Sequence, residues 1–87
     1  QPLAIRFLTA SPGPLRTGTV TRVGPLDAVL GARGVVQAET YLTVGETIRP
    51  VRLDGDRRGY VIATAATSIE ALQRAEHAAG LLEVDVA

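Results

Sequence analysis

The 87-residue sequence predicts one α+β domain, built on a mainly antiparallel, curled β-sheet with one short and one longer helix. Short runs rich in Val, Ile and Thr alternate with turns that contain Gly and Pro, which is typical of strands in sequence. Two segments have helical spacing with start and stop signals, and all connections are short. A chain of this length hides only about 60–65% of its unfolded surface, so it holds one modest core.

The N-terminal part of the chain is expected to form two strands and a short helix. Residues 3–8 indicate a short buried strand, which ends at a Pro-Gly-Pro turn because prolines cannot continue a ladder. Residues 16–23 carry Thr and Val at strand-like spacing. Residues 24–31 predict a short helix, with Pro25 at the first helical position and Gly31 as a left-handed stop.

Two further strands are expected in the middle of the chain. Residues 35–44 alternate between apolar and polar side chains, and the apolar set expected on the core side is Val36, Ala38, Leu42 and Val44. Residues 48–53 predict an edge strand, because Pro50 cannot donate to a neighbouring strand. Residues 54–56 (Asp-Gly-Asp) are typical of a hairpin turn; a calcium loop would need more oxygen ligands, including a distant Glu.

The C-terminal part predicts the central strand, the longer helix and a closing strand. Residues 59–66 form the most hydrophobic run and are placed at the centre of the sheet. Thr67 and Glu70 fit a capping box that starts a helix, and Gly80 is its expected stop. Residues 82–86 alternate as a closing strand does. The expected apolar face of the helix is Leu72, Ala75, Ala79 and Leu82.

The composition excludes several classes of protein. Nine basic and nine acidic residues give a net charge of zero, and all nine basic residues are Arg. The arginines are interleaved with acids and aromatic residues are few, so we expect no nucleic-acid partner. The absence of Lys excludes Schiff-base chemistry and a P-loop, and the absence of Cys excludes disulfides and thiolate zinc sites. No run is long enough to span a membrane, so we expect a cytoplasmic protein without a membrane partner.

No catalytic residue and no metal site are predicted within the sequence. His77 is the only histidine, and it falls with Glu70, Gln73 and Arg74 on the polar side of the second helix. A lone histidine without a nearby nucleophile is typical of a surface residue. Nothing in the pattern assembles a nucleophile, a base and an oxyanion hole.

Three arginines are the candidates for contact with a substrate or with another domain. Arg57 and Arg58 stand together at a strand entrance, where two guanidiniums could grip a phosphate or carboxylate; alternatively they pair with Asp54 and Asp56. Arg6 lies inside an apolar strand, and its flanking residues predict that it points away from the core. It then meets either solvent or a partner surface.

Three segments of the sequence carry a resemblance to a known family. They are AIRFLTASPGPL, GVVQAETYLTVGETIRP and DRRGYVIATAATSIEAL. Together they resemble the C-terminal domain of ATP-grasp ligases, most closely the L-amino-acid ligase type and more distantly phosphoribosylglycinamide synthetase and biotin carboxylase. The resemblance covers roughly residues 3–86, and none of these segments is a catalytic signature. The half-barrel C-terminal domain of those enzymes is the implied fold.

The resemblance implies the C-terminal part of an ATP-dependent carboxylate–amine ligase that works through an acyl-phosphate. In such enzymes ATP and Mg²⁺ are held by the preceding domains, so we expect no cofactor in residues 1–87 and both in the parent enzyme. The expected partners are the preceding ATP-grasp domains of the same chain, with a second copy as a further candidate. The chain begins at Gln1 and contains no Met, so we expect a fragment of a larger ligase that is inactive alone. The alternative is a stand-alone interaction or dimerisation module.

Overall fold

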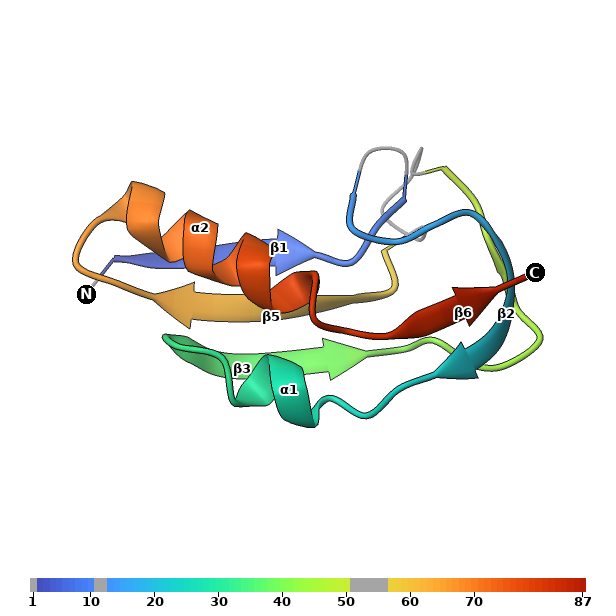
Figure 1. Ribbon diagram of the computed structural model, residues 1–87. Helices are drawn as coiled ribbons and strands as arrows, with labels where there is room; N and C mark the ends of the chain where they lie inside the picture. Colours follow the sequence, from blue (N-terminus) through green and yellow to red (C-terminus); the bar gives the residue numbers. More distant parts are fainter. Residues whose placement is uncertain (1, 11–12, 51–56) are drawn as a thin grey trace.

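The computed structural model describes residues 2–10, 13–50 and 57–87, which form two helices and six strands in the order β-β-α-β-β-β-α-β (Figure 1). This order and the α+β class confirm the prediction. The predicted hairpin turn at residues 54–56, and residues 51–53 of the predicted edge strand, lie outside the described residues. The elements are β1 (Leu3–Phe7), β2 (Gly18–Val23), α1 (Asp27–Leu30), β3 (Val35–Thr40), β4 (Thr47–Ile48), β5 (Gly59–Thr64), α2 (Ser68–Ala79) and β6 (Val84–Val86).

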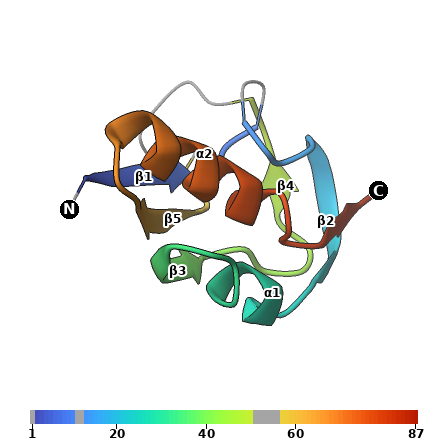
Figure 2. The same cartoon turned by 60° about the vertical axis from the view of Figure 1, so that its left-hand side comes forward.

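The strands divide between two antiparallel three-stranded sheets. The first has the order β1-β5-β3, with β5 at the centre as predicted. The second has the order β4-β2-β6 and lies beside one end of the first (Figure 2). β4 lies at the edge of this sheet, because it pairs only with β2 among the described strands. Of the edge strand predicted over residues 48–53, only Ile48 belongs to β4, and Pro50, on which the prediction depended, is not in a strand. The expected curled sheet is therefore built from two short sheets.

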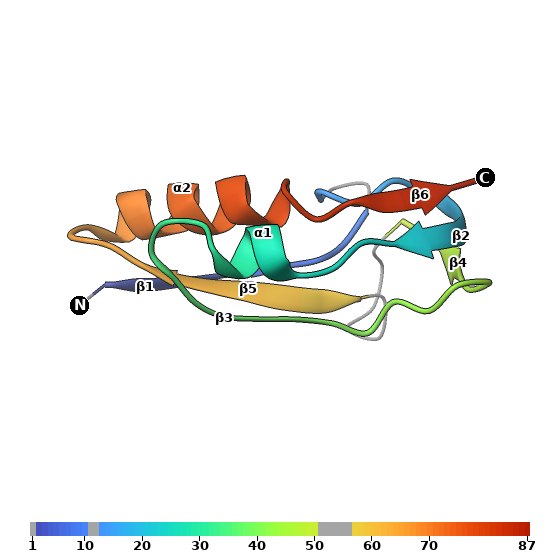
Figure 3. The same ribbon diagram turned by 60° about the horizontal axis from the view of Figure 1, so that its bottom comes forward.

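Both helices lie on the same side of the first sheet (Figure 3). Four alanines of α2 are buried against this sheet, whose central strand contributes the buried Val61 and Ala63. Small side chains let the helix approach the strands closely. The apolar helix face was predicted wrongly at one position: Leu72 is 43% exposed, because the alanines set the rotation of the helix. The four buried alanines are Ala71, Ala75, Ala78 and Ala79.

The helix ends follow the predicted chemistry only in part. The Thr67 hydroxyl accepts from the Glu70 backbone N–H at 3.1 Å, as the capping box predicts. The Glu70 carboxylate instead reaches the N–H of Ala66, at 3.3 Å. In the short helix, Pro25 precedes the cap residue and does not occupy the first helical position. Gly31 ends this helix with φ −82°, so the predicted left-handed stop is wrong.

A bulge in β3 changes which of its side chains face the core. Val35 pairs with Ala63 and Gln37 with Ile62, so Val36 is the extra residue of the bulge. Val36 is 60% exposed, and Val44, which follows the strand, is 68% exposed. The prediction that these two valines face the core is therefore wrong. Ala38 and Leu42 are buried as expected.

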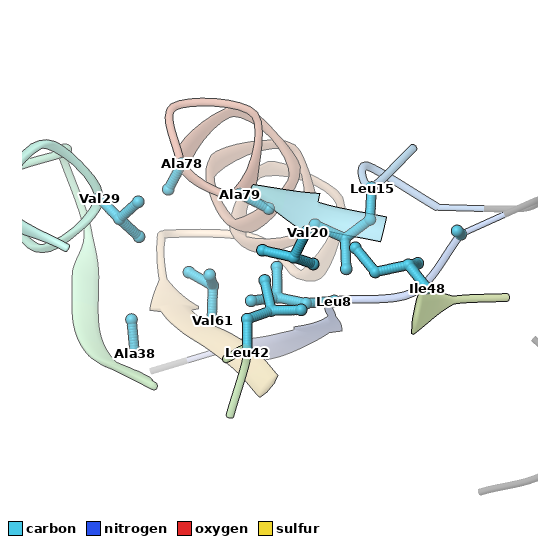
Figure 4. Packing of buried hydrophobic residues seen from close by; sticks show 11 residues of the cluster. Leu8, Leu15, Val20, Val29, Ala38, Leu42, Ile48, Val61, Ala78 and Ala79 are labelled. Atoms are coloured by element: carbon cyan, nitrogen blue, oxygen red, sulfur yellow. The ribbon is translucent and has the colours of Figure 1, made fainter. Parts of the chain in front are cut away.

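The core fills the space between the helix layer and the two sheets (Figure 4). Leu8 and Val20, from the two sheet regions, are each 1% exposed and belong to one continuous cluster. The thinnest extent of the molecule is 14 Å, against 39 Å and 26 Å along the other axes. This thickness fits one helix layer on one sheet, because packed layers lie about 10 Å apart. The remaining buried members are Ala10, Leu15, Val29, Ala38, Leu42, Ile48, Val61, Ala78 and Ala79.

Candidate functional site

One face of the first sheet carries apolar side chains that no described element covers. Residues paired directly across antiparallel strands point to the same side of a sheet. Ile5 pairs with Ile62 and Phe7 with Tyr60, on the side away from the helices. Leu3 and Ile5 are 55% and 45% exposed. We call this surface the open sheet face and define it by Leu3, Ile5 and Phe7 of β1, Tyr60 and Ile62 of β5, and Gln37 and Glu39 of β3.

The β3 side of the open sheet face is polar. Gln37 donates a hydrogen bond from Nε2 to the Tyr60 hydroxyl at 2.7 Å. Burial, followed by the negative charge of Glu39, raises the pKa of Tyr60 above its ordinary value. The Tyr60 hydroxyl therefore lies between the apolar and polar halves of the face.

Arg57 lies at the end of the open sheet face. Its guanidinium carbon is 3.9 Å from the centre of the Phe7 ring, which is a cation–π contact. Planar guanidinium groups stack on aromatic rings and still keep N–H groups for a carboxylate or a backbone carbonyl. Arg57 therefore places a positive charge at the border of an apolar surface.

Arg58 points elsewhere and is mostly enclosed. Its Nε lies 3.5 Å from a Glu46 carboxylate oxygen, and its side chain is only 15% exposed. Its backbone N–H donates to the Leu8 carbonyl at 2.7 Å, and its carbonyl accepts from the Tyr41 N–H at 2.9 Å. Arg58 thus joins three segments of the fold, and the structure does not bring it together with Arg57 in one site.

The prediction that Arg6 points away from the core is wrong. Arg6 pairs with Val61, which is 1% exposed, so its side chain starts on the helix-covered side of the sheet. The argument from sequence fails because the flanking Ile5 and Phe7 themselves face outward. Arg6 is half-buried, on a strand at the edge of the first sheet.

His77 lies in an open groove of about 410 Å³ between the two helices. As expected, it is exposed and shares a helix face with Gln73 and Arg74. Arg33, which follows α1, lines the opposite wall, and no pattern in the sequence indicates that it lies near α2. We call this the α1–α2 groove; its lining is Ala28, Gly31, Ala32, Arg33, Glu70, Gln73, Arg74, His77 and Leu81.

The described residues contain no cluster of three or more His, Asp or Glu side chains placed to hold a metal ion. Neither described helix has the length or the apolar run needed to cross a membrane.

The comparisons with known proteins give one family. No curated protein and no solved structure matches the chain. A family model, described as L-amino acid ligase C-terminal domain 2, matches residues 6–87 and so covers nearly the whole sequence. The chain belongs to the family of L-amino acid ligase C-terminal domains.

Proposed function

We propose that this domain completes an ATP-dependent carboxylate–amine ligase by packing its open sheet face against the ATP-grasp core of the same chain. The observation that best supports the proposal is the apolar open sheet face, which no described element covers. It occurs in a chain that belongs to a family of ligase domains. In such a reaction the carboxylate takes the γ-phosphoryl group of ATP, which releases ADP and forms an acyl-phosphate. The amine then attacks the acyl carbon, forms the amide and releases phosphate.

The domain's part in this reaction is to close one side of the active site. ATP and Mg²⁺ belong to the preceding domains in this proposal, and residues 1–87 are not catalytic by themselves. Exclusion of water from the site protects an acyl-phosphate from hydrolysis. The open sheet face suits this role, because an apolar surface is more stable when it is packed against another surface than when it faces water.

Arg57 is the arginine best placed to contact the neighbouring domain. It borders the open sheet face and its guanidinium stacks on Phe7. Arginine is one of the residue types that most often form hot spots in protein interfaces. Arg6, half-buried on the edge strand, is a second candidate. Arg58 contributes indirectly, because its ion pair with Glu46 fixes the chain that leads into β5.

The test uses the full-length ligase that carries this domain and a matched pair of substitutions. Ile5→Glu places a charge on the open sheet face, whereas Ile69→Glu places the same charge on α2, where Ile69 is 73% exposed. We expect amino-acid-dependent ADP release to fall strongly in Ile5→Glu and to stay near the wild-type value in Ile69→Glu. Circular dichroism of the 87-residue variants checks that both fold.

Equal activity of the two variants would contradict the proposal. Sedimentation of the 87-residue chain measures its oligomeric state and so tests the alternative function, a dimerisation module. A dimer that Ile5→Glu separates, together with unchanged ligase activity, would assign the open sheet face to a second copy. Arg57→Gln, with Arg16→Gln as control, tests the border contact in the same ADP-release assay.

A further inference from the structure

The α1–α2 groove lies on the helix side of the first sheet, away from the open sheet face. One wall comes from α1 and the residues after it, and the other comes from one face of α2. Its volume of about 410 Å³ falls in the range of sites that bind small molecules. The groove is therefore a candidate site separate from the proposed domain contact.

Arg74 is a positioned cation in the α2 wall. Its Nη1 donates to the Thr64 carbonyl at 3.0 Å, and its Nη2 lies 3.7 Å from a Glu70 carboxylate oxygen. Its side chain is 23% exposed. Gly34, with φ +84°, lies directly against it, since a Cβ at Gly34 would come within 2.7 Å of the Arg74 Cδ. The guanidinium is held in place before any ligand arrives.

Arg33 supplies a second cation from the opposite wall. Within residues 2–10, 13–50 and 57–87 it is exposed and has no hydrogen bond or ion pair. The two guanidiniums of the lining exceed the single carboxylate of Glu70, so the groove is positively charged. An oxyanion that enters it meets an arginine whose donors are all available.

Apart from Gln73 and His77, the rest of the lining is small or aliphatic. Ala28, Ala32 and Leu81 give the groove an apolar surface, and the ring that lines it is the exposed imidazole of His77. A bare inorganic anion would leave this apolar surface in contact with water. The lining fits a ligand that joins a negative charge to an aliphatic body.

We propose that the α1–α2 groove binds a small aliphatic carboxylate, with Arg33 and Arg74 toward its charge and the alanines and Leu81 against its body. The proposal rests on these residues and not on the proposed ligase role, so either can fail alone. The probe is isovalerate, and isovaleramide is its matched neutral control. Inorganic phosphate tests whether charge alone is sufficient.

The experiment follows backbone amide shifts of the ¹⁵N-labelled 87-residue chain during titration with each probe. We expect saturable shifts with isovalerate at Gly31, Ala32, Gly34 and His77, and no saturable shifts with isovaleramide. Arg33→Gln should weaken isovalerate binding about fivefold, as loss of one charge contact predicts. Ala28→Glu, which adds a negative charge to the exposed side of α1, should abolish binding.

The control variant is Arg16→Gln, since Arg16 is exposed and bonds to the Val84 carbonyl, whose strand contributes nothing to the groove. Its isovalerate affinity should equal that of the wild type. The proposal is overturned if isovaleramide or phosphate binds as tightly as isovalerate. It is also overturned if no saturable shift appears at the groove, or if Arg33→Gln and Arg16→Gln bind isovalerate equally.

Discussion

Replacing Val61 with Ala tests the assignment of the two faces of the first sheet. Val61 is 1% exposed on the central strand, under the alanines of α2. The substitution removes two methyl groups from the core and leaves a small cavity beneath a helix that already packs through short side chains. Relaxation of the surroundings is limited there, because alanines have no rotamers with which to fill the space.

The expected cost is about 2.5 kcal/mol of unfolding free energy. Transfer of two methyl-sized groups accounts for about 1.6 kcal/mol of it, and the unfilled volume accounts for most of the rest. In a domain of this size, such a loss lowers the thermal midpoint by about 10–20 °C. The slope of the denaturation curve should not change, since the surface exposed on unfolding is nearly the same.

The assay is urea unfolding followed by far-ultraviolet circular dichroism, because the chain contains no Trp. The matched control is Val36→Ala, the same substitution at the 60% exposed bulge of β3, which should cost no more than about 0.5 kcal/mol. If both variants unfold at the same urea concentration, α2 does not cover the Val61 side of the sheet. The orientations of Ile5 and Arg6, which follow from their pairing with Ile62 and Val61, would then also be wrong.

Three other substitutions, one of them with a matched control, probe the cap of α2, the close contact between β5 and β3, and the titration of Tyr60. Thr67→Ala should cost about 1 kcal/mol in urea unfolding, since it removes the hydroxyl that caps α2. Gly59→Ala should lower the free energy of unfolding by at least about 3 kcal/mol, because φ is +141° and the new Cβ would overlap the Glu39 carbonyl. Its control is Gly45→Ala, which should cost only about 1 kcal/mol, because φ is +97° but the space around Gly45 is open. The pKa of Tyr60 in the folded chain is raised above its ordinary value of 10.0, so the unfolded chain loses the Tyr60 proton at a lower pH than the folded chain does. The free energy of unfolding therefore falls as the pH rises past 10.0. Tyr60→Phe should reduce that fall, and an unchanged pH profile would show that the environment of Tyr60 is wrongly described.

The features that could be predicted from sequence are those with a local cause. The capping box at Thr67, the strong β-propensity of residues 59–64 and the alternation before the C-terminus each depend on a few neighbouring residues. They predicted the element order and the central strand correctly. The resemblance in three segments similarly led to the family that the family model gives.

The features that were missed depend on contacts between distant segments. The bulge at Val36 arises from pairing with β5, and the exposure of Leu72 arises because α2 rotates its alanines toward the sheet. The orientation of Arg6 followed from its register with Val61, 55 positions later in the chain. Arg33 joined the α1–α2 groove only through tertiary packing. Local pattern contains no information about such neighbours.

The pairing of early strands with late ones determines when this domain can form during synthesis. β1 is made before the other strands of this domain, yet its only strand partner among the described elements, β5, ends at Thr64 (Figure 1). β2 has a two-residue pairing with β4 and gains its longer one only when β6 is made at Val84–Val86. Closing such long loops comes before any gain from the contacts, which slows folding. The two sheets are therefore complete only after Val84–Val86 has been made, and Leu3, Ile5 and Phe7 stay unpaired and accessible to chaperones until β5 has been made.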